Sequence, residues 1–76
     1  MKTADRIVVS KTLSVLLNEL KEECQQTLKL MSRLETKDLT SEQLASILSE
    51  LVGSVVHLHA HTEGLQDQIN DEIEEL

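Results

Sequence analysis

Apolar residues recur at steps of three and four along most of the chain, and no proline interrupts them. This spacing brings side chains onto one stripe of an α-helix and is typical of heptad repeats. The first run comprises Leu13, Leu17, Leu20, Cys24, Met31 and Leu34, with Thr27 at the one missing position. The second comprises Leu44, Leu48, Leu51, Val55, Leu58, Leu65 and Ile69, with Thr62 at the gap. The sequence therefore predicts an all-α fold of two long helices, each with an apolar stripe.

A helix-start signal separates the two runs. In the segment LETKDLTSEQL, Thr40 is the expected N-cap and Gln43 completes a capping box, while Leu39 and Leu44 form a hydrophobic staple. We predict a first helix over about 4–35, a turn at 36–40 and a second helix over about 41–74. So short a turn makes the helices antiparallel neighbours in one hairpin domain that spans 1–76, with residue i opposite about 75 − i.

Charge is distributed unevenly along the chain, whose formal net charge is −7. Six basic and five acidic residues fall in 1–35, whereas one basic and nine acidic residues fall in 36–76. The second helix is thus expected to present an acidic surface, which favours a partner with a basic patch. Within the hairpin, Lys2, Arg6 and Lys11 are expected to lie beside the acidic residues of 67–76 and to attract them.

Composition argues against several classes of partner. The chain has no Phe, Tyr or Trp and is acidic, which disfavours nucleic acid because stacking platforms and phosphate-binding charge are both missing. No apolar run approaches the roughly 20 residues of a membrane span. The N-terminal segment resembles a weak signal peptide, but Lys11 interrupts it. With a single cysteine, Cys24, a disulfide framework is excluded, and we expect a cytoplasmic protein with a reduced thiol.

The apolar arc of each helix is wider than one hairpin can bury. Leu16, Leu28 and Leu30 flank the first stripe, and Ile47, Val52 and Val56 flank the second. We therefore predict a homodimer in which two hairpins form a four-helix bundle. The expected interface residues are Leu16, Leu28, Ile47, Val52, Val56 and His59. The alternative is that the extra apolar surface binds a different protein, in which case the chain would be unstable alone.

Three histidines alternate in the stretch VVHLHAHTEG. His57 and His61, four residues apart, share one helix face as metal-binding pairs do, whereas His59 lies on the other flank. A metal site would need a third ligand, and the expected register puts Glu19 near His57, with Glu22 or Glu23 one turn further. Two other interpretations compete: a pH-sensitive contact of His59 or His61 at the bundle flank, or histidines that simply border the stripe and bond to water or glutamate.

The sequence contains no pattern that predicts catalysis or a bound cofactor. Cys24 falls in the apolar stripe, where a thiol behaves as a small inert hydrophobe. The favoured function is a non-enzymatic protein–protein interaction module, such as a small adaptor, regulator or complex subunit, that acts as a dimeric helical bundle. The alternative function is a metal-binding or metal-responsive bundle that uses His57 and His61.

Overall fold

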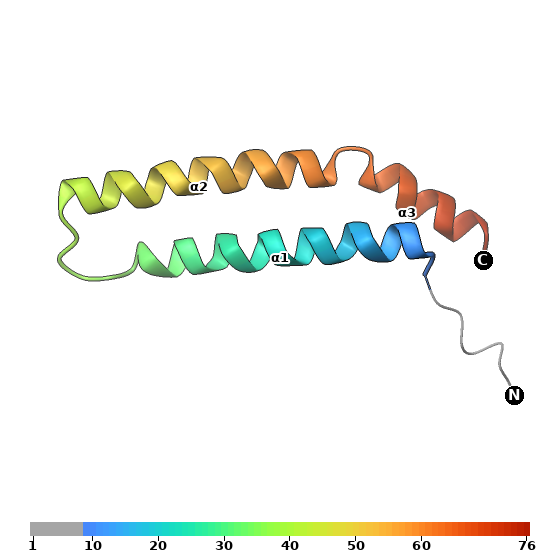
Figure 1. Ribbon diagram of the computed structural model, residues 1–76, viewed down its shortest axis with the longest axis horizontal. Helices are drawn as coiled ribbons and strands as arrows, with labels where there is room; N and C mark the ends of the chain where they lie inside the picture. Colours follow the sequence, from blue (N-terminus) through green and yellow to red (C-terminus); the bar gives the residue numbers. More distant parts are fainter. Residues whose placement is uncertain (1–8) are drawn as a thin grey trace, which may run out of the picture.

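The computed structural model describes residues 9–76 and shows an antiparallel helical hairpin (Figure 1). Helix α1 spans Lys11–Arg33, α2 spans Ser41–Thr62, and α3 spans Leu65–Glu74. Helices α1 and α2 lie side by side, and α3 follows α2 and slants toward the start of α1. The molecule is a flat rod of 58 × 26 × 14 Å. The predicted all-α hairpin is confirmed.

Side-chain caps mark the start of both long helices. Ser10 caps α1, and its Oγ accepts a hydrogen bond of 3.2 Å from the backbone N–H of Leu13. At α2, Thr40 and Gln43 form the predicted capping box, with reciprocal bonds of 3.0 and 2.9 Å. The predicted start of the first helix near residue 4 lies outside the described residues, but Val9 and Ser10 are not helical.

Removing the α2 cap is expected to destabilise the hairpin modestly. We expect Thr40→Ala to lower the free energy of unfolding by about 1 kcal/mol, because an N–H group at the helix start loses its acceptor. Urea titration followed by circular dichroism measures this change. Ser41→Ala is the matched control, since Ser41 is exposed and makes no cap bond. Equal effects of the two substitutions would contradict the role of the cap.

The second rod is not the single helix predicted over about 41–74. Helix α2 ends at Thr62, Glu63 is extended with ψ of 124°, and Gly64 adopts a left-handed φ of 76°. Glycine occupies this conformation without the steric cost that a side chain brings. The break turns α3 toward α1, where Oε2 of Glu72 accepts a bond of 2.8 Å from the backbone N–H of Ser10.

The hairpin buries few apolar side chains. Leu13, Leu30, Ile47 and Leu65 are buried, and Leu16, Leu20, Leu34, Leu51 and Leu58 are half-buried around them. Six of these nine were predicted in the stripes, namely Leu13, Leu20, Leu34, Leu51, Leu58 and Leu65, whereas Leu16, Leu30 and Ile47 were expected on the flanks. The predicted stripe residues Leu17, Cys24, Met31, Leu44, Leu48, Val55 and Ile69 are instead exposed. Two predicted dimer-interface residues, Leu16 and Ile47, belong to the hairpin contact.

A hydrogen bond joins the acidic end of the rod to the start of α1. Lys11 opens α1 at the end where α3 lies, as predicted, and Glu72 is bonded there to Ser10. Lys2 and Arg6, which were expected to face the acidic residues of 67–76, lie outside the described residues.

Candidate functional site

The exposed stripe residues define a candidate apolar face. We define this apolar face as Leu17, Cys24 and Met31 of α1, Leu44, Leu48 and Val55 of α2, and Ile69 of α3; all are exposed. Because each residue advances a helix by about 100°, the face residues of α1 and α2 point roughly 70–90° away from the buried residues of the same helices, which are Leu13 and Leu30 in α1 and Ile47 and Ser54 in α2. The offset has the same sense about the axis of each helix. Because the two helices are antiparallel, both stripes therefore lie on the same side of the hairpin.

The opposite side of the hairpin is polar. There Nη1 of Arg33 lies 3.6 Å from Oε2 of Glu50, which joins α1 to α2 near the turn. Further along, Nδ1 of His57 lies 3.4 Å from Oε1 of Glu23. The hairpin thus has an apolar side and a polar side. Within residues 9–76, the charge contacts between α1 and α2 all lie on the polar side.

Glu23 is the centre of a polar cluster between the helices. Its side chain is only 15% exposed. Its Oε2 accepts a bond of 3.1 Å from Oγ of Ser54, a residue that is 5% exposed. Its Oε1 faces His57 and also lies 4.0 Å from Nε2 of His61. A mostly buried carboxylate requires such partners, because an unpaired one would carry a large desolvation cost.

The contacts of this cluster show that the helix register differs from the predicted one by about one turn. The prediction placed Glu19 beside His57, whereas the structure places Glu23 there. It confirms that His57 and His61 share one side of α2. His59 is exposed and is absent from the cluster. Within residues 9–76, no group of three or more His, Cys, Asp and Glu side chains is arranged to hold a metal ion.

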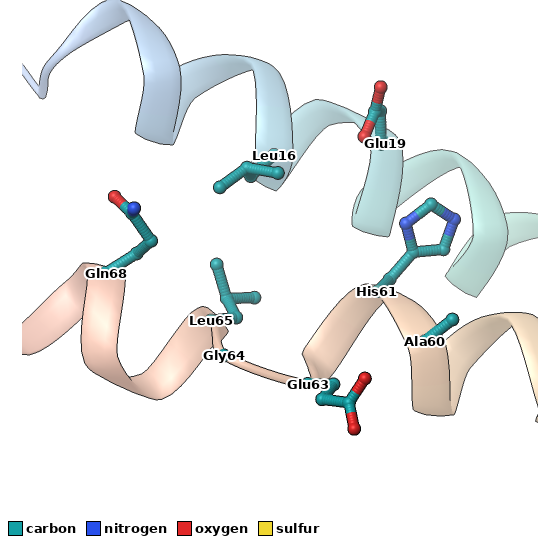
Figure 2. A pocket seen from close by; sticks show the side chains of 8 residues that line it. All are labelled: Leu16, Glu19, Ala60, His61, Glu63, Gly64, Leu65 and Gln68. Atoms are coloured by element: carbon teal, nitrogen blue, oxygen red, sulfur yellow. The ribbon is translucent and has the colours of Figure 1, made fainter.

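A shallow cleft lies where α2 breaks from α3 (Figure 2). Leu16 of α1 and Leu65 of α3 face each other across it, and His61 extends from α2 toward α1. Glu63 also borders the cleft, but its carboxylate points away. A second groove, almost wholly apolar, is lined by Leu48, Leu51, Val52, Val55 and Val56 of α2. The groove shares Leu48 and Val55 with the apolar face, whereas Val52 and Val56 line its outer side.

The chain was compared with protein-family models, with curated proteins and with solved structures. None of the three comparisons gave a match. Among the described residues, no helix combines the length and the hydrophobicity needed to cross a membrane. The assignment of a site therefore depends on the geometry of the hairpin itself.

We expect the Ser54 hydroxyl to contribute measurably to hairpin stability. Ser54→Ala should lower the free energy of unfolding by about 1–3 kcal/mol, because the mostly buried carboxylate of Glu23 loses a donor. Ser49→Ala is the control, since Ser49 is exposed on the same helix and a change within about 0.5 kcal/mol is expected. Urea unfolding at one protein concentration compares them, and no difference between the variants would contradict the account.

Proposed function

We propose that this protein is a non-enzymatic protein–protein interaction module whose apolar face packs against a second copy of the chain. The observation that carries the proposal is the direction of the two heptad stripes. In a four-helix bundle the two neighbours of each helix lie in directions about 90° apart, so the apolar residues that meet the second hairpin are offset by about that angle from the contact within the first. Helices α1 and α2 both have this offset, and on the same side. A second hairpin laid on the apolar face would complete the bundle.

The energetics of a lone hairpin support the same proposal. Four buried apolar side chains are a small core for a chain of this length, and chains this short seldom bury enough surface to be stable alone. The apolar face exposes seven side chains from three helices, none of them charged. Together with Leu28 and Val52 at its edge, it provides an area of the order of the ~800 Å² per partner that specific interfaces bury.

The interface that we propose differs from the residues predicted first. Leu28, Val52 and His59 are exposed at the edge of the apolar face, where they would line the rim of a dimer. Val56 points outward from α2 at the margin of the apolar face, about 100° beyond Val55. The dimer contact is therefore assigned to the stripe residues, with Val55 near the middle of the α2 portion.

Cys24 provides a direct test, because the only thiol of the chain lies on the apolar face. At concentrations where the dimer forms, we expect Cys24 to react with a soluble disulfide reagent at least roughly tenfold more slowly than after dilution to monomer. The same chain in urea supplies the fully accessible rate. A thiol that reacts at the urea rate in concentrated native protein would contradict packing on this face.

The wider setting that we propose is a cytoplasmic adaptor, regulator or complex subunit. The single reduced thiol supports this location. The acidic second half of the chain, which would remain on the outside of the bundle, suits a further protein partner with a basic surface.

The alternative function is metal binding, and one observation favours it. Both imidazoles of the predicted pair, His57 and His61, approach the same oxygen of Glu23, the mixed nitrogen and oxygen donor set that zinc accepts. We rank it second because residues 9–76 contain no three-residue group arranged for a metal ion. Zinc titration by calorimetry tests it: micromolar binding that His57→Ala removes and His59→Ala retains would support the alternative, and no heat would eliminate it.

A further inference from the structure

The two ends of the rod differ in charge. The open end, where α3 lies, carries Glu63, Asp67, Asp71, Glu72, Glu74 and Glu75, with no Lys or Arg among residues 62–76. Beside them, α1 contributes Lys11, and Lys2 and Arg6 lie outside the described residues. The turn end is close to balanced, because Lys29, Arg33 and Lys37 stand against Glu35, Asp38, Glu42 and Glu50. In a dimer, the relative orientation of the two copies determines which of these ends lie side by side.

Two symmetric arrangements place the apolar faces together. With the two-fold axis parallel to the helices, both turns lie at the same end and α1 packs on α2 of the partner. With the axis perpendicular to the helices, the turns lie at opposite ends, α1 packs on the partner's α1, and α2 packs on the partner's α2. Both arrangements keep neighbouring helices antiparallel, so helix packing alone does not choose between them.

Charge distinguishes them. With the turns together, the two acidic ends lie side by side and repel. With the turns apart, each acidic end lies beside the nearly balanced turn end of the partner. Resting on the proposed function, we infer that the hairpins pair with their turns at opposite ends, α1 against α1, because only this arrangement keeps the acidic α3 helices of the two copies apart.

The spacing of the α1 residues of the apolar face fits this arrangement and locates its axis. In α1 the face consists of Leu17, Cys24 and Met31, which are symmetric about Cys24. With the axis at Cys24, Leu17 packs against Met31 of the second copy, and the two thiols meet at the helix crossing. On the same axis, the rise of about 1.5 Å per residue brings the partner's turn level with α3. Lys37 in the turn of one copy then lies at the level of the acidic α3 of the other.

Distances between spin labels test the orientation. A nitroxide on Thr36→Cys, in a Cys24→Ala background, marks the exposed turn. We expect a distance of about 35 Å or more between labels with the turns apart, and under roughly 20 Å with the turns together. A label on Gln25→Cys, exposed near mid-rod, should lie within roughly 25 Å of its mate in either arrangement and so reports dimer formation alone.

The outcomes separate the two proposals. No dipolar signal from either site overturns the homodimer itself. A signal from Gln25→Cys with a short distance between turn labels overturns only the orientation. In the unsubstituted chain, mild oxidation should yield a Cys24–Cys24 disulfide dimer if α1 packs on α1, because the thiols then meet at the axis. Failure to form it in a chain shown to be dimeric would also overturn the orientation.

Discussion

Replacing Val55 with glutamate is expected to dissociate the homodimer. Val55 lies on the apolar face, and in the bundle its side chain would be enclosed by the partner. A buried charge without a partner costs about 3–5 kcal/mol, which corresponds to an association weaker by roughly 150-fold to 4,000-fold. Because the substitution enters both copies, the effect on the dimer is at least this large. Sedimentation velocity over a dilution series measures the change in the dissociation constant.

Val56 is the control for this substitution, because it is also a valine and is adjacent to Val55. Val56 is 59% exposed and Val55 is 56% exposed in the single chain, so a hairpin that acts alone would respond to both substitutions alike. Val56 points outward from α2 at the margin of the apolar face, where a charge can stay in water when the partner packs on Val55. We expect Val56→Glu to retain the dimer. Equal loss of association in the two variants would show that the apolar face is not the contact.

The second large effect is expected inside the hairpin. Leu30 is 2% exposed and is the most buried large side chain of the described chain. Leu30→Ala should lower the free energy of unfolding by about 2–5 kcal/mol, because apolar contacts are lost and a cavity remains. For a chain with so small a core, that loss is expected to remove most of the helical signal at 25 °C. Circular dichroism and urea titration at fixed concentration measure it.

Leu28→Ala is the matched control for this prediction. The same change is made two residues away on the same helix, but Leu28 is 61% exposed at the rim of the apolar face. We expect a cost below about 1 kcal/mol. If Leu28→Ala destabilised the chain as much as Leu30→Ala, the assignment of core and rim would be reversed.

The sequence predicted the helices and the turn well, because local signals specify them. The step of three and four determines a helix, and Thr40 with Gln43 determines where α2 begins. The stripes were right in part: Leu13, Leu20, Leu34, Leu51, Leu58 and Leu65 are buried or half-buried, whereas the other apolar stripe residues are exposed. Periodicity identifies which residues share a face but not what that face meets. Apolar residues have the same spacing in the sequence whether their stripe points at one neighbouring helix or between two neighbouring helices. Leu30 and Ile47 are buried because α1 and α2 meet on the flank of their stripes.

Two further features were missed for different reasons. The break at Gly64 has a local signal, a glycine at the C-terminus of a periodic segment, which the continuing heptads obscured. Glu23 has a weaker signal, because an acid beside an apolar stripe is usually solvated. Glu23 becomes a partly buried centre only because Ser54 and His57 approach it from the other helix. Which residues approach depends on the helix register, and the spacing of the sequence predicted that register only to within about one turn.

Sedimentation equilibrium of the unsubstituted chain tests the central claim most directly. The chain has a mass of 8.5 kDa, so the account predicts a species of about 17 kDa at micromolar concentration, with a melting temperature that rises as concentration rises. A cooperatively folded species of 8.5 kDa, whose melting temperature does not change on dilution, would contradict it.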